Sequence, residues 1–219
     1  MAIMLTPFSS PATAEEEAYR FLLNGIRMGQ FKAGDRIVPE EIASQLGMSR
    51  MPVREAFRRL ATQELLTIRP NRGAVVRGLN HQEAIEVFEM RAVLEGLAAT
   101  AALDRIGPAD IDELERRLDA MDRCAEDLSA WVTEHRDFHL YLCGLSARPR
   151  LVAQIAALHV CIEPHMRLWL QSTYKPRPSR EEHGFIIDAL RRKRPELIEA
   201  VVREHVSSTL VTLAKLMHP

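Results

Sequence analysis

Two short helical patterns separated by a glycine turn constrain the fold of this chain more than any other feature. The first pattern begins at Pro39, where a missing N–H costs nothing in the first helical turn, and it stops at Gly47. The second begins after Ser49, a residue type that caps helix N-termini. Its apolar positions recur at helical spacing and consist of Val53, Ala56, Phe57 and Leu60. Two short helices joined in this way predict a helix-turn-helix.

A ridge of arginines lies on another face of the second of these helices. Arg50, Arg54 and Arg58 follow one another at four-residue intervals, so their side chains share one face. Residues 49–77 carry seven arginines against two glutamates, a local charge of +5, whereas the whole chain has a net charge of −1. A basic patch confined to one segment is typical of a surface that contacts DNA phosphates, although a solvated helix face has the same charge.

Two β-prone runs after this helix predict a two-stranded wing. They span residues 65–68 and 74–76 and flank a basic tip that ends at Gly73. Arg72 at this tip is placed to reach the minor groove or the phosphate backbone, and Gly73 would let the backbone approach DNA closely. We therefore predict a winged helix-turn-helix domain over residues 13–78.

The start of the second helix carries the residues that we expect to contact DNA. A recognition helix places its N-terminal side chains on base edges in the major groove. Here these side chains belong to Ser49, Arg50, Met51 and Arg54, with Arg58 one turn further along. Arginine suits a bidentate contact with guanine, and Ser49 together with the first N–H groups of the helix can hold a phosphate.

Beyond residue 78 the sequence changes to long helical patterns with few turn residues. We expect helices near 81–104, 108–127, 129–146, 148–172, 179–191 and 194–217. Pro164 lies inside the fourth of these and is expected to kink its axis. These patterns predict an antiparallel all-helical bundle over residues 79–219, so the fold class of the whole chain is mainly α.

Composition narrows the class of protein. No stretch of about 20 residues lacks charge, so we expect no membrane span. Residues 1–12 have no basic start, which favours a disordered lead-in over a signal peptide. An odd number of widely spaced cysteines favours reduced thiols in a cytoplasmic protein, and these are Cys124, Cys143 and Cys161.

Four histidines in the second half form a candidate metal site. His135 and His139 lie four residues apart and share one helix face, and His183 and His205 fall on two later helices. Four imidazoles that meet inside a bundle would bind Zn²⁺ or Ni²⁺. A buried histidine more often makes only a hydrogen bond, so the residues by themselves leave both interpretations open.

Three segments of the first half together resemble the DNA-binding domain of the GntR family. They are Lys32-Ala33-Gly34-Asp35-Arg36-Ile37, Ser49-Arg50-Met51-Pro52-Val53-Arg54-Glu55-Ala56 and Arg72-Gly73. The resemblance implies that Ser49, Arg50, Arg54 and Gly73 contact bases or phosphates. Members of the family often have a basic residue where this chain has Glu40.

The second half resembles the FCD ligand domain of FadR-type regulators, in the shorter VanR-like branch. The segments that carry this resemblance are 87–96, Phe138-His139, Pro149-Arg150-Leu151, Glu182-His183 and Glu204-His205. Members bind metal through an Asp four residues before a His, together with two later His. The resemblance implies a metal site of His135, His139, His183 and His205, in which His135 replaces the usual Asp and makes the site more positive by one unit. The added charge would favour an anionic ligand or a softer metal.

We therefore expect a DNA-binding transcription regulator, a repressor in the commoner family pattern, whose C-terminal pocket binds a small carboxylate effector. A homodimer would place two recognition helices about 34 Å apart on palindromic double-stranded DNA. Arg91 and Arg167 are candidates to grip the carboxylate, and His159 and His165 are further candidate ligands. Surface charge or core packing would explain each of these four residues equally well. The alternatives are a metal-free pocket with structural histidines, or a helical metalloenzyme fused to a DNA-binding domain. We predict no catalytic residue.

Overall fold

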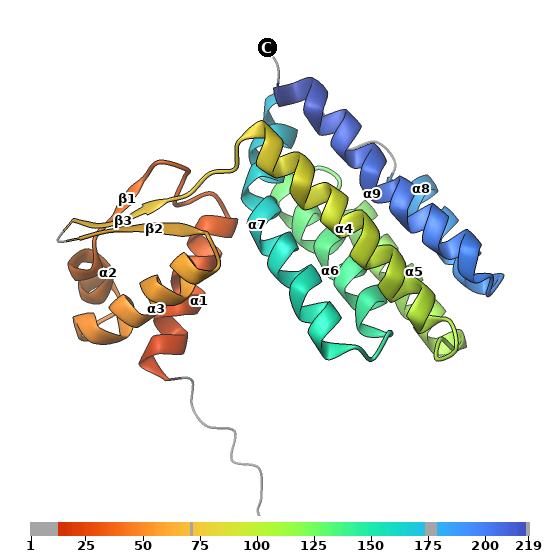
Figure 1. Cartoon of the computed structure of the whole chain (residues 1–219), viewed down its shortest axis with the longest axis horizontal. Helices are drawn as coiled ribbons and strands as arrows, with labels where there is room; N and C mark the ends of the chain where they lie inside the picture. The colour runs from red at the N-terminus through yellow and green to blue at the C-terminus, as the bar shows by residue number, and fades with distance from the viewer. Residues whose placement is uncertain (1–12, 71, 174–178, 218–219) are drawn as a thin grey trace, which may run out of the picture. The chain divides into compact units, whose positions relative to one another are not determined.

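The computed structural model describes residues 13–70, 72–173 and 179–217 and is mostly helical (Figure 1). The chain divides into two compact units, Met1–Gly78 and Leu79–Pro219. The predicted fold class, a winged helix-turn-helix followed by an all-helical bundle, is confirmed. The disordered lead-in expected at residues 1–12 lies outside the described residues.

The first unit packs three helices around the predicted apolar face. They are α1 (Ala14–Arg27), α2 (Pro39–Gln45) and α3 (Arg50–Thr62). The Thr13 hydroxyl accepts the backbone N–H of Glu16 at 3.2 Å and so caps α1. Ser49 occupies the N-cap position of α3, but its hydroxyl makes no capping hydrogen bond. The predicted face of α3 is buried and packs against α1 and α2.

The wing is a three-stranded antiparallel sheet, one strand more than the sequence predicts. Its strands are β1 (Arg36–Ile37), β2 (Leu66–Arg69) and β3 (Gly73–Val76), in the order β1-β3-β2. The short β1 pairs Arg36 with Val75 and Ile37 with Ala74. Two residues are too few to show an alternating pattern, so this strand has no signal in the sequence.

Gly73 has a structural role that the sequence did not indicate. Its φ is +82°, and a Cβ at this position would lie 2.3 Å from the carbonyl oxygen of Ile37. Only glycine fits this left-handed backbone beside a neighbouring strand. The packing of β1 on β3 therefore requires Gly73 whether or not this residue also touches DNA.

The second unit contains helices at all six of the predicted places. They are α4 (His81–Ala102), α5 (Pro108–Arg123), α6 (Leu128–Gly144), α7 (Pro149–Thr173), α8 (Ser179–Arg191) and α9 (Pro195–Met217). A reciprocal capping box of Asn80 and Glu83 begins α4. The helices α4 and α9 run side by side, and α6 and α7 pack against α4 (Figure 1). Pro164 lies within α7 without ending it.

We predict that Gly73→Ala lowers the free energy of unfolding by about 1–3 kcal/mol, because the new methyl group meets a backbone carbonyl in a left-handed conformation. Urea denaturation followed by circular dichroism measures the change. The matched control is Gly144→Ala, where an added Cβ meets nothing within 4 Å and stability should hold or rise. A Gly73→Ala protein as stable as its parent would contradict the packing role.

Candidate functional site

The predicted DNA-contacting side chains lie on the exposed face of α3. Arg50, Arg54 and Arg58 are all exposed, and Met51 beside them is 65% exposed. The Arg50 guanidinium lies 3.1 Å from Glu40, and Arg58 pairs with Glu55. Such surface ion pairs contribute about 0–1 kcal/mol, so DNA phosphates can compete for these arginines.

A basic hollow of about 420 Å³ lies between α3 and the wing. Five arginines line it, namely Arg36, Arg54, Arg58, Arg69 and Arg72. The Arg36 side chain donates a hydrogen bond to the backbone carbonyl of Arg72 at 2.8 Å, which holds it against the tip of the wing. Arg36 and Arg69 were not among the predicted site residues. The unpredicted strand β1 brings Arg36 here; Arg36 lies in the segment 32–37 that resembles the family, but nothing in that segment indicated contact with the wing.

The four predicted metal ligands meet inside the second unit. His135 and His139 come from α6, His183 from α8 and His205 from α9, and all four are buried. Each offers one ligand atom, and these atoms all lie within 4.8 Å of one another. The spacing of two histidines on one helix face and the packing of α8 and α9 together bring these rings to one point.

The distances within this cluster fit a metal ion. The Nε2 atoms of His139 and His205 lie 3.2 Å apart. Two imidazole nitrogens at about 2.0–2.1 Å from a tetrahedral Zn²⁺ are about 3.3–3.4 Å apart. The Nδ1 atom of His139 lies 2.8 Å from Glu95, and that of His205 lies 3.5 Å from Glu182. A proton on each Nδ1 leaves two Nε2 lone pairs facing each other, and a cation between them would remove this repulsion.

Burial keeps the imidazoles of His135 and His139 neutral, which is the state that binds metal. It lowers the pKa of His139 to about 4, against the opposing effect of Glu95. Burial, followed by the neighbouring imidazoles, holds the pKa of His135 well below its usual range. Both lone pairs therefore remain available at neutral pH.

Each of the two units of the chain matches a known domain family. Residues 14–76 match "Bacterial regulatory proteins, gntR family", and residues 86–208 match the FCD domain. The chain belongs to the GntR family.

Individual relatives extend this match over nearly the whole chain. The probable D-xylose utilization operon transcriptional repressor of Paenarthrobacter nicotinovorans is 32% identical over 205 residues, which are 92% of this chain and 89% of that protein. The solved structure of McbR/YncC from E. coli has a TM-score of 0.82 at 26% identity and covers 94% of this chain and 99% of its own. A putative GntR regulator from Rhodococcus sp. RHA1 shares the fold, with a TM-score of 0.78, 22% identity, and coverage of 92% and 97%.

This GntR-family protein is a transcriptional regulator with a DNA-binding domain and an FCD domain, and its relatives and fold are those of regulators, not of enzymes. Among the described residues, no helix is long and apolar enough to cross a membrane.

The predicted effector ligand Arg91 lies beside the histidine cluster of the regulator. Its side chain is fully buried, and its Nε donates to Glu95 at 2.8 Å. Its Nη2 lies 3.2 Å from Nε2 of His159, while Nη1 has no hydrogen-bond partner among the described residues. Glu95 itself was not predicted. It stands one helical turn after Arg91, a spacing that sequence reasoning takes for an ordinary surface ion pair.

The other candidate effector ligands have different partners. Nε2 of His165 accepts the backbone N–H of Leu79 at 2.7 Å and so fastens the segment before α4 to α7. Arg167 donates to Glu163 at 2.7 Å and to the Thr133 hydroxyl at 2.8 Å. These contacts indicate structural roles for both residues.

We predict that the metal-free protein loses stability as the pH falls from about 7 to 5. The histidine pKa is near 6.5 in the unfolded chain, while that of buried His139 is about 4 and that of buried His135 is also lowered, so the unfolded chain binds more protons in this window. Each such histidine contributes up to about 1.4 kcal/mol per pH unit below 6.5, and the loss is complete below the folded pKa. Urea denaturation at several pH values measures the slope. A free energy of unfolding that stays constant over this range would contradict the neutral cluster.

Proposed function

We propose that this regulator is a homodimeric repressor that binds palindromic double-stranded DNA through α3 and the wing. The exposed arginine ridge of α3 and the five arginines of the basic hollow support this role. The ridge suits base edges, and the hollow suits a phosphate that approaches beside the recognition helix. The relative from Paenarthrobacter nicotinovorans is described as a repressor, which supports the same direction of control here.

We further propose that the histidine cluster binds a divalent metal, Zn²⁺ or Ni²⁺. The main support for this metal site is the pair of Nε2 atoms of His139 and His205. They face each other at 3.2 Å, and a carboxylate lies near the Nδ1 atom of each ring. His135 and His183 complete a set of four imidazole donors. A bound metal would supply a positive centre that anchors an anionic effector.

The charged groups around the proposed metal favour a small carboxylate as the effector. A divalent ion together with Arg91 and Glu95 gives a net charge of +2 in a buried space, since an imidazole that binds a metal does so in its neutral form. The Nη1 group of Arg91, which lacks a partner among the described residues, offers the carboxylate a donor. Four imidazoles fill a tetrahedral Zn²⁺ shell, whereas octahedral coordination leaves two positions open. A six-coordinate ion such as Ni²⁺ would therefore accept the carboxylate directly.

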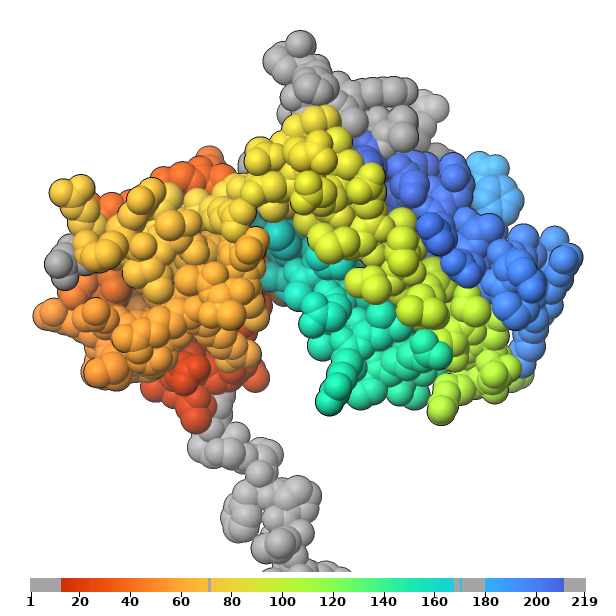
Figure 2. Space-filling model, in the orientation of Figure 1, coloured from red at the N-terminus to blue at the C-terminus, as the bar shows by residue number. Residues whose placement is uncertain are grey.

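The dimer would form along α4. Three apolar side chains on one face of this helix are 43–46% exposed, namely Met90, Val93 and Leu97. Figure 2 shows the helix uncovered in this view. Exposed Glu86 and Glu89 stand at one end of the face, and the Arg203–Glu199 ion pair packs over Gly96 near the other end. A second copy in antiparallel orientation would keep the two acidic ends apart and cover the apolar side chains of both helices.

We predict that Arg54→Ala weakens operator binding about 5- to 150-fold, because one arginine contact to a base contributes about 1–3 kcal/mol. The operator is first selected from random duplex DNA with the parent protein, and affinity is then measured by fluorescence anisotropy at fixed salt. Arg116→Ala is the matched control, since Arg116 is an exposed arginine on α5. Equal affinity of the Arg54→Ala and Arg116→Ala proteins would contradict the assignment of the recognition helix.

We predict that the parent protein retains about one Zn²⁺ or Ni²⁺ per chain after dialysis and that His139→Ala binds the ion at least about tenfold more weakly. Inductively coupled plasma mass spectrometry gives the metal content, and chelator competition gives the affinity. His165→Gln is the control, because His165 is a buried histidine outside the cluster. A parent free of metal that still responds to carboxylates would favour structural histidines.

A further inference from the structure

The carboxylate of Glu95 occupies a central position next to the histidine cluster. Its side chain is 1% exposed. One oxygen, Oε1, lies 2.8 Å from Nε of Arg91 and 3.1 Å from Nε2 of His159. The other, Oε2, lies 2.8 Å from Nδ1 of His139, although the N–H does not point straight at it. One buried carboxylate thus joins α4, α6 and α7.

The His139 contact decides which nitrogen of that ring faces the cluster. A carboxylate beside Nδ1 favours the proton on Nδ1 and leaves the lone pair on Nε2. This Nε2 is the atom that lies 3.2 Å from Nε2 of His205. We propose that Glu95 is a positioning residue, which orients His139 for metal binding and makes α4 respond to the metal. This inference rests on the metal site proposed above.

The proposed response of α4 to metal binding follows from the position of this helix in the chain. Glu95 lies on the helix α4, which begins at His81, three residues after the DNA-binding unit ends at Gly78. A metal that fixes the His139 ring also fixes the position of its Glu95 partner, and therefore of α4 against α6. Because α4 is the element to which the DNA-binding unit is joined, it is suited to report metal binding to that unit.

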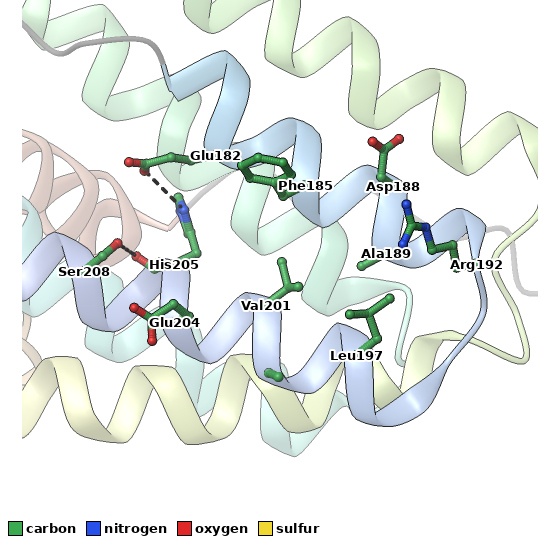
Figure 3. Close-up of a pocket in the computed structure, with 11 residues that line it drawn as sticks. Glu182, Phe185, Asp188, Ala189, Arg192, Leu197, Val201, Glu204, His205 and Ser208 are labelled. Atoms are coloured by element: carbon green, nitrogen blue, oxygen red, sulfur yellow. Dashed lines mark hydrogen bonds and ion pairs between the residues drawn. The ribbon is translucent and has the colours of Figure 1, made fainter.

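Glu182 provides an internal comparison. It lies beside Nδ1 of His205, but the distance is 3.5 Å and its side chain is 59% exposed. Figure 3 shows Glu182 and His205 at one end of a groove of about 540 Å³ between α8 and α9, with Phe185, Leu197 and Val201 along its length. Water screens this contact, so Glu182 should orient its histidine much less firmly than Glu95 does.

The test measures Zn²⁺ and Ni²⁺ affinity by chelator competition in the full-length protein. Glu95→Gln is expected to weaken binding about 10- to 100-fold, as removal of an outer partner of a metal-binding histidine usually does. Glu182→Gln and Glu163→Gln are expected to stay within about threefold of the parent, well below that range. Glu163 is the matched control, since it is 2% exposed and paired with Arg167 and Arg136. Equal affinity of Glu95→Gln and Glu163→Gln would overturn the proposal.

Two further readouts keep the proposal testable if Glu95→Gln folds poorly. In the metal-free parent, ¹⁵N NMR is expected to show His139 protonated at Nδ1, and protonation at Nε2 would overturn the proposal without any substitution. Hydrogen exchange of residues 91–99 should slow when Zn²⁺ is added to the parent and should not slow in Glu95→Gln. A parent that binds no metal refutes the proposed metal site itself, whereas a parent that binds metal as tightly as Glu95→Gln refutes only the role of Glu95.

Discussion

The interior of the C-terminal unit holds the four-histidine cluster, the buried His159 and the Arg91–Glu95 ion pair, and the packing of its helices depends on satisfying these polar groups. Burying a charge without a partner is costly, so Glu95 needs Arg91 and its two histidine neighbours. Its pKa stays well below the usual range because Arg91, then His139 and His159, outweigh the effect of burial. This requirement brings α4, α6 and α7 to the same place.

The two units use charge in opposite ways. On α3 and the wing, arginines are exposed and share a hollow with few acidic partners, which leaves them ready for DNA phosphates. In the helical unit, Arg91 and Arg167 are buried and each is paired with a glutamate one turn away. The same residue type therefore serves recognition in one unit and internal order in the other.

The sequence predicted the long elements well because their apolar residues repeat at helical spacing over many turns. It missed β1, whose two residues pair with β3 only through contacts between distant parts of the chain. Gly73 was expected to contact DNA. The structure adds a second reason for a glycine at this position, because a Cβ would meet the carbonyl oxygen of Ile37. Residue types and spacing indicated the four histidines as metal ligands. Glu95 was not predicted, because local sequence does not show whether an i, i+4 ion pair is buried or exposed.

The regulator is proposed to hold a divalent ion with four imidazoles next to Glu95. X-ray absorption spectroscopy of the purified protein loaded with one equivalent of Ni²⁺ or Zn²⁺ tests this most directly. The predicted spectrum has nitrogen neighbours at about 2.0–2.1 Å, with the multiple scattering of about four imidazole rings. A shell that contains only oxygen or sulfur neighbours would contradict the claim.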